Sequence, residues 1–261
     1  MTIQASTSAI KPFFRFPFDD RQSKERFWIG TGLIFAGFII PIIPGLFVYG
    51  YVLRIIRSTS QGEVPSMAAW DDWSGMLSLG FRGAIVNLVF TLPALIVFMF
   101  GYAAYFGSFL LLPLSSSSDP KAAAASVLAM FAGMGTLFIS LAIGSILLML
   151  GLIPLPASVS HFVAKDQISA AFRVREWWRI LSRNWLGYFI SFVIVAGILG
   201  LTYFGLLALY YTIILACLAV LITIPITFYT MLVGGALFGE AYRQGVESLR
   251  QPLVDGGDTA Q

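Results

Sequence analysis

The sequence contains very few side chains that could perform chemistry. His161 is the only histidine among 261 residues, and its nearest polar neighbours along the chain are Ser158, Ser160 and Lys165. No spacing typical of a metal site, a nucleophile elbow or a phosphate-binding loop is present. We therefore expect no enzymatic activity and no metal or other cofactor, and we interpret His161 as a packed or interfacial residue.

A basic and aromatic segment at residues 174–186 is the clearest candidate contact site. Arg175, Arg179 and Arg183 recur every four residues and share one face of a helix, whereas Trp178 faces elsewhere. Helices of this kind lie in the membrane interface. Two interpretations stay open: a contact with anionic lipid or a protein partner, and a plain anchor beside a membrane span.

Two further candidate contacts are polar. Asp71 and Asp72 stand between Trp70 and Trp73, where they would contact a partner or would simply favour the dipole at a helix N-terminus. Asn87 is the most polar residue early in an apolar run, and amides commonly hydrogen-bond between membrane helices. We therefore expect Asn87 to make an intramembrane polar contact.

Four long stretches without Asp, Glu, Lys or Arg dominate the chain: residues 27–53, 83–118, 122–164 and 184–239. A membrane-spanning helix needs roughly 20 apolar residues. Charged residues make up 11% of this chain, against about 25% in soluble domains. The sequence therefore predicts an all-α, multi-pass transmembrane helix bundle with proline-broken helices. It forms one domain over residues 16–246, with flexible tails at 1–15 and 247–261.

The first apolar run is long enough for one span, but it contains Pro41 and Pro44. Either one kinked helix crosses the membrane, or two half-helices enter and leave on the same side. The second arrangement places every Lys and Arg except Lys121 on the cytoplasmic side, which the positive-inside rule favours. We therefore expect both termini to be cytoplasmic, in the cell (inner) membrane. A re-entrant turn at 41–45 would need polar partners, and we expect Asn87 within hydrogen-bond reach of it.

Three segments share a pattern in which an aromatic stretch with an acid opens an apolar run that passes a proline and ends with an aromatic and basic stretch. The openings are Phe18-Asp19-Asp20, Trp70-Asp71-Asp72-Trp73 and Glu176-Trp177-Trp178, and the ends are Tyr49 to Arg54, His161-Phe162 to Lys165, and Tyr242-Arg243. The pattern predicts three helical hairpins, the first shortened, each preceded by an interfacial elbow. The alternative is that Pro, Gly and Trp simply gather at membrane boundaries. Further breaks are expected at Pro154 and near Tyr210–Tyr211.

Several short motifs in the first third of the chain point to one family. They are Pro17-Phe18-Asp19-Asp20, Gly50-Tyr51-Val52-Leu53-Arg54-Ile55-Ile56-Arg57, Gly62-Glu63-Val64-Pro65, Trp70-Asp71-Asp72-Trp73 and Pro93. Through them, residues 16–93 resemble the prokaryotic membrane family catalogued as domain of unknown function 4013. The resemblance implies a bacterial or archaeal multi-pass membrane protein without an established activity, and it carries over no functional residue.

Our functional hypothesis is a non-catalytic membrane component. It would contact membrane lipid, a protein partner or a second copy of the chain through its cytoplasmic elbows. The alternative is a small-solute or lipid transporter that uses the helix breaks at Pro44 and Pro154 as backbone ligands. No ionisable residue lies deep in an apolar run, which favours the first hypothesis. Because the basic residues sit at membrane edges, we expect no nucleic-acid partner.

Overall fold

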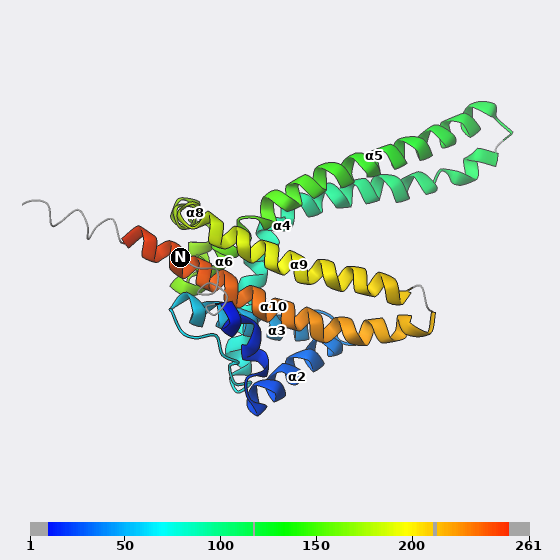
Figure 1. Cartoon of the computed structure of the whole chain (residues 1–261). Coiled ribbons are helices and arrows are strands. Elements are labelled where there is room, and N and C mark those ends of the chain that lie inside the picture. Colours follow the sequence, from blue (N-terminus) through cyan, green and yellow to red (C-terminus); the bar gives the residue numbers. More distant parts are fainter. Residues whose placement is uncertain (1–9, 117, 211–212, 251–261) are drawn as a thin grey trace, which may run out of the picture. The chain divides into compact units, whose positions relative to one another are not determined.

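The computed structural model describes residues 10–116, 118–210 and 213–250, and every regular element in these ranges is helical (Figure 1). In chain order the elements are η1 (Phe16–Phe18), α2 (Arg21–Ala36), α3 (Ile43–Ser60), α4 (Trp73–Phe109), η2 (Leu112–Ser116), α5 (Pro120–Leu152), α6 (Leu155–Lys165), α7 (Ile168–Ala171), α8 (Val174–Arg183), α9 (Trp185–Tyr210) and α10 (Ile213–Arg250).

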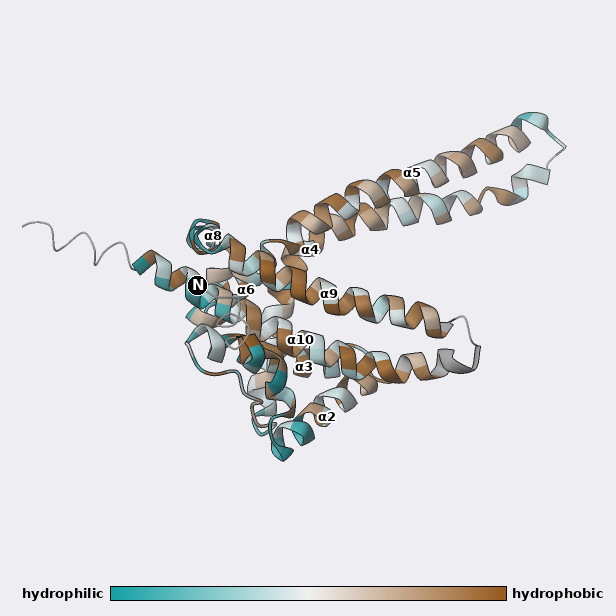
Figure 2. Ribbon diagram, viewed as in Figure 1, coloured by the Kyte–Doolittle hydropathy of each residue, from teal (hydrophilic) through white to brown (hydrophobic). Residues whose placement is uncertain are grey.

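Four helical segments are long and apolar enough to cross a membrane: Trp73–Phe109, Pro120–Lys165, Trp185–Leu209 and Leu221–Arg250. The prediction of an all-α, multi-pass helix bundle is confirmed. Figure 2 shows apolar residues along most of α9 and a largely polar α8. Leu201 and Phe204 of α9 expose 78% and 70% of their surface, as suits side chains solvated by lipid.

The chain divides into two compact units. Among the described residues, 10–86 and 156–250 belong to the first unit, and 87–155 belong to the second. The second is a hairpin made by the later part of α4 and by α5. Small residues bring its two helices together, because a side chain on Gly101 would overlap Ser140 and one on Gly133 would overlap Ser108.

The first apolar run folds as two helices and not as one kinked helix. Between α2 and α3 the chain turns at Ile42, which has φ 76°, and the amide of Ile43 donates to the carbonyl of Pro41 at 3.0 Å. This is a γ-turn of the rare, strained kind. Pro44 lies in the first turn of α3, where the N–H that proline lacks would have no helical partner.

After the turn, α3 runs back alongside α2, so that the start of α2 and the middle of α3 lie against the same part of α10. Phe27 of α2 and Tyr51 of α3 both contact Phe228 of α10, with ring centroids 5.4 and 6.2 Å apart. The two helices also contact each other along the hairpin. This is the arrangement that the re-entrant interpretation expects, and its placement in the membrane stays a prediction.

Helix α3 lies against its neighbours backbone to backbone. A side chain on Gly50 would overlap the carbonyl of Met76 in α4, and one on Gly80 would overlap the carbonyl of Leu46. Both overlaps involve main-chain atoms, which cannot rotate away as a side chain can. Glycine is therefore required at both positions for this crossing of α3 and α4.

Small residues of α10 cover another face of α3. A side chain on Gly235 would reach Val52, and one on Gly239 would overlap the hydroxyl of Thr59. The two glycines at 235 and 239, four residues apart, thus allow α10 to pack closely on α3. Gly107 of α4, by contrast, makes no such close approach, because a side chain there would meet nothing within 4 Å.

The break predicted at Pro154 separates α5 from three shorter helices that lead to the last hairpin, α9–α10. Helix α5 ends at Leu152, α6 begins at Leu155, and the short α7 and α8 lead into α9. Helices α9 and α10 lie side by side (Figure 1). Helix α9 ends at Tyr210, where we predicted the turn, and residues 211–212 lie outside the described ranges. The described residues thus contain three helical hairpins, α2–α3, α4–α5 and α9–α10, of which the first is the shortest.

Candidate functional site

Helix α8 is anchored on its inner face. Trp177 and Ile180 expose only 3% and 7% of their surface, and the indole N–H of Trp177 donates to the carbonyl of Ala171 at 3.0 Å. Just after the helix, the side-chain amide of Asn184 donates to the carbonyl of Ala241 in α10 at 2.8 Å. The elbow is therefore a folded part of the molecule, with a fixed orientation against α10.

The outer face of α8 carries the predicted contact residues. Arg175, Arg179 and Arg183 are exposed, and Trp178 exposes 55% of its surface. None of these three arginines forms an ion pair within the described residues. Their charges are thus free for an external partner, although contact with such a partner stays a prediction.

A polar triad made of the buried His161 and Tyr242 and the half-exposed Glu176 lies where α6, α8 and α10 meet. His161 of α6 is 2% exposed. Its Nδ1 lies 2.8 Å from the hydroxyl of Tyr242 in α10, and its Nε2 lies 3.0 Å from Oε2 of Glu176 in α8. A guanidinium nitrogen of Arg173 lies 3.5 Å from Oε1 of the same carboxylate. We expected His161 to be a packed or interfacial residue; its ring is buried, and both ring nitrogens have partners.

The partners fix the tautomer of a neutral His161. An ionised Glu176 only accepts hydrogen bonds, so Nε2 carries the proton and donates it. Nδ1 then accepts from the hydroxyl of Tyr242. The hydrogen bond from His161 is the main reason that the pKa of Glu176 lies below its ordinary value, and Arg173 adds to the effect.

The triad forms one wall of a pocket of about 340 Å³. Three cations reach it from three helices: Lys165 at the end of α6, Arg179 on α8 and Arg250 at the end of α10. All three are exposed and make no ion pair within the described ranges. The remaining lining residues are the triad and the apolar side chains of Ile180, Val246 and Leu249.

The sequence missed this site because its parts lie far apart along the chain. Glu176 is 15 residues from His161 and Tyr242 is 81 residues from it. One signal was available: a histidine near the end of a long stretch without charge must find partners when it is buried. Glu176 and Tyr242 both belonged to the repeated pattern, but the pattern did not pair them. Among the described residues, no group of three His, Cys, Asp or Glu side chains could hold a metal ion.

The acidic candidate site has a local structural role. The carboxylate of Asp72 accepts from the amide of Gly75 at 2.9 Å at the start of α4, and it forms an ion pair with Arg54 of α3. The Gly75 amide, together with Arg54, lowers the pKa of Asp72. Asp71 accepts from the amide of Asp72 at 2.9 Å. The helix N-terminal interpretation therefore accounts for Asp72, while a partner contact at Asp71 stays a prediction.

The aromatic residue before these acids is held just as firmly. Trp70 stacks on Tyr51 with ring centroids 4.1 Å apart, and its indole N–H donates to the carbonyl of Arg26 at 2.9 Å. The loop before α4 is thereby tied to both helices of the first hairpin.

A second acid, Asp166, links helices within the first compact unit. Asp166, directly after α6, binds Arg57 of α3 at 2.6 Å and Arg82 of α4 at 3.3 Å. Asp166 has φ 52°, a left-handed conformation that Asp adopts more readily than most residues. The three helices are therefore linked by one carboxylate.

Asn87 was expected to contact the turn at 41–45. Its backbone carbonyl accepts a hydrogen bond from the hydroxyl of Thr91 at 3.0 Å. Its side-chain amide makes no hydrogen bond with the described residues. Asn87 is the first residue of the second compact unit, whereas the turn belongs to the first. The contact stays a prediction.

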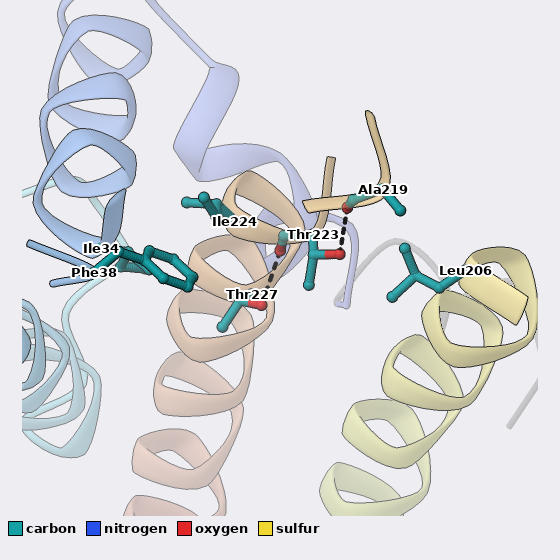
Figure 3. A pocket seen from close by; sticks show the side chains of 7 residues that line it. All are labelled: Ile34, Phe38, Leu206, Ala219, Thr223, Ile224 and Thr227. Atoms are coloured by element: carbon teal, nitrogen blue, oxygen red, sulfur yellow. Dashed lines mark hydrogen bonds between the residues drawn. The ribbon is translucent and has the colours of Figure 1, made fainter. Parts of the chain in front are cut away.

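Two adjoining apolar pockets of about 410 Å³ each lie at the helices that surround Phe38. Figure 3 shows the first, lined by Ile34 of α2, by Phe38 in the turn after α2, by Leu206 of α9, and by Ala219, Thr223, Ile224 and Thr227 of α10. The two hydroxyls of this pocket donate to α10 carbonyls at 2.6 and 2.8 Å. An occupant would therefore meet no free side-chain donor. The second pocket shares Ile34, Phe38 and Thr227 with the first.

Comparison with known proteins gives one match. No curated protein and no solved structure matches the chain significantly. One family model matches residues 33–211, a range that runs from the first hairpin through α8 to the end of α9. The match covers more than half of the chain and agrees with the resemblance seen in residues 16–93. The chain therefore belongs to the family described as protein of unknown function, DUF4013.

Proposed function

We propose that this protein is a non-catalytic membrane component that binds anionic lipid through helix α8. The observation that carries the proposal is the outer face of α8, where Arg175, Arg179 and Arg183 are exposed and unpaired beside an exposed Trp178. The inner face of the helix is fixed to the bundle by Trp177. A rigid basic and aromatic helix of this kind suits the headgroup layer.

The charge of the lipid follows from the charge of the helix. Each basic residue near an anionic surface contributes about 1 kcal/mol of attraction, and the effect falls off within a Debye length. We place α8 and both termini on the cytoplasmic side of the cell membrane, where the basic residues accumulate. A protein partner or a second copy of the chain on the same face is the competing occupant.

The test compares lipid retention by the full chain. The protein is placed in nanodiscs that contain equal amounts of phosphatidylglycerol and phosphatidylethanolamine, released, and its lipid adducts are counted by native mass spectrometry. The wild type should retain an excess of the anionic lipid. Replacing Arg175, Arg179 and Arg183 with Gln should abolish the excess, because about 1 kcal/mol per charge corresponds to a factor of about five per residue.

Two matched variants sharpen the result. The triple Arg→Lys variant keeps every charge and should retain the excess. Trp178→Ala keeps the arginines and removes the exposed aromatic ring, so it should weaken retention of both lipids without changing their ratio. An unchanged excess in the triple Gln variant would reject the lipid contact and leave α8 as an anchor.

A lipid transporter is the second candidate, and the two apolar pockets around Phe38 favour it. Together they offer a surface that is apolar and free of unpaired hydroxyls, as an acyl chain requires. Protein reconstituted in liposomes should then speed the movement of a fluorescent lipid between leaflets. Ala219→Phe, which fills the first pocket, should slow that movement. A rate equal to that of protein-free liposomes would contradict this candidate.

A further inference from the structure

We propose that the pocket between α6, α8 and α10 binds a phosphate monoester group. The inference rests on the proposed function, since it assumes that this face of the molecule lies at headgroup level, and it deepens that function by giving the face a specific ligand. The pocket is a concave site of about 340 Å³, within the size range of small-molecule sites.

The charge of the pocket requires an anion. Lys165, Arg179 and Arg250 surround it without ion pairs in the described part of the chain. The one carboxylate present, Glu176, is already occupied by His161 and Arg173. Three cations are therefore brought together by three helices without a counter-charge of their own. Like charges so placed repel each other unless a ligand neutralises them.

The amount of charge selects the class of anion. A phosphate monoester carries about −1.5 to −2 at neutral pH and has three strong acceptor oxygens, so it can bind all three cations at once. A phosphodiester carries a single charge and offers fewer terminal oxygens. Arginine also matches phosphate oxygens in a two-pronged geometry. We therefore expect the pocket to prefer a monoester over a diester.

The polar wall of the pocket is held in place. Tyr242 and His161 are both buried and hydrogen-bonded to each other, and His161 is bonded in turn to Glu176. These side chains cannot rotate toward a ligand without breaking that chain of bonds. They give the pocket a fixed shape, while the flexible Lys165, Arg179 and Arg250 close on the anion.

The apolar wall indicates what the phosphate is attached to. Ile180, Val246 and Leu249 line the pocket beside the cations. A bare phosphate ion would leave these side chains facing water, whereas a lipid headgroup would place its glycerol and the first carbons of its chains against them. A membrane lipid and a soluble metabolite could both carry such a monoester phosphate, and the experiment distinguishes these two sources.

The experiment uses the full chain in nanodiscs that contain phosphatidylethanolamine with 10% of one anionic lipid. That lipid is phosphatidic acid, a monoester, or phosphatidylglycerol, a diester. Glycerol 3-phosphate is added as the soluble probe. Lipid retention and the melting temperature are measured for the wild type and for two double variants of equal charge loss. Lys165→Gln with Arg250→Gln alters the pocket, and Arg175→Gln with Arg183→Gln alters the outer face of α8 only.

We expect the wild type to retain phosphatidic acid at least tenfold better than phosphatidylglycerol. The pocket variant should lose this preference, and the outer-face variant should keep it. Val246→Trp fills the pocket without changing any charge, and it should also abolish the preference. Competition by glycerol 3-phosphate at millimolar concentration would support a soluble source, and its absence would support the lipid.

Other outcomes overturn the proposal. No preference for phosphatidic acid in the wild type would reject the site. An equal loss in the two double variants would show that the chain senses total charge and not the pocket. The proposed function can fail separately from this site. In that case the outer-face variant would retain as much phosphatidylglycerol as the wild type, while the pocket variant would still lose the preference for phosphatidic acid.

Discussion

Arg54 of α3 forms an ion pair with Asp72, the acid that precedes α4. The same relationship recurs one hairpin later, where His161 of α6 binds Glu176 of α8, just before α9. In both cases a side chain on the helix before an elbow binds the acid of that elbow. Two elbows of the repeated pattern are therefore each tied, through their acid, to a helix that precedes them within the first compact unit.

Removing the imidazole of His161 should destabilise the protein. His161→Phe leaves the buried hydroxyl of Tyr242 without a partner, which costs about 1–3 kcal/mol. His161→Gln keeps some hydrogen-bonding capacity and should cost less. Thermal unfolding in detergent measures both. If the two residues are coupled, the double variant with Tyr242→Phe will lose less than the sum of the single losses, and strict additivity would contradict the pair.

Stability should fall at acidic pH through Glu176. Its pKa is lowered in the folded protein, so its contribution is complete above the ordinary value of 4.5 and is lost as the pH falls below that value through the folded pKa. The melting temperature of Glu176→Gln should therefore drop less than that of the wild type between pH 6 and pH 3.5. Glu63→Gln, which removes an exposed carboxyl, should follow the wild type. Parallel curves for Glu176→Gln and the wild type would refute the linkage.

The crossing of α3 and α4 should not tolerate a methyl group. Gly50→Ala would place its Cβ against the carbonyl of Met76, and overpacking of this kind costs about 1–3 kcal/mol or more. Gly45→Ala lies on the same helix with nothing within 4 Å of the new Cβ and serves as the control. Melting temperatures in detergent should separate the two variants clearly, and equal values would contradict the close crossing.

Both termini should label from the cytoplasm. Single cysteines at Ser6 and Thr259, in a Cys217→Ala background, should react with a membrane-impermeant thiol reagent only after the cells are opened. The basis is the accumulation of Lys and Arg on one side, together with a first hairpin that returns to its starting level. Labelling of Ser6 in intact cells would require the first hairpin to cross.

The sequence predicted the helices well because their signals are local. Long stretches without charge, Pro41, Pro44 and Pro154 determine where helices run and break, and each break lies where it was expected. The spacing of Arg175, Arg179 and Arg183 likewise predicted α8 and its exposed face. These features depend on residues only a few positions apart.

The pairings could not be predicted because they join distant positions. Nothing in the local pattern shows that Tyr242 would meet His161, or that Asp166 would bind both Arg57 and Arg82. The division into two compact units was likewise invisible, because residue 87 lies inside the uncharged run 83–118 and inside one continuous helix, α4. Contacts between helices depend on which faces meet, and a single sequence does not encode that in its periodicity.

The position of α3 between α4 and α10 bears on the order of biosynthesis. Chains are made from the N-terminus, so the crossing at Gly50 and Gly80 can form early, while Val52 and Thr59 wait for Gly235 and Gly239 of α10. Until α10 leaves the ribosome, α3 has an uncovered side and His161 lacks Tyr242. This part of the core can therefore form only after α10 has been synthesised, and a product cut short before α10 would be a target for membrane quality control.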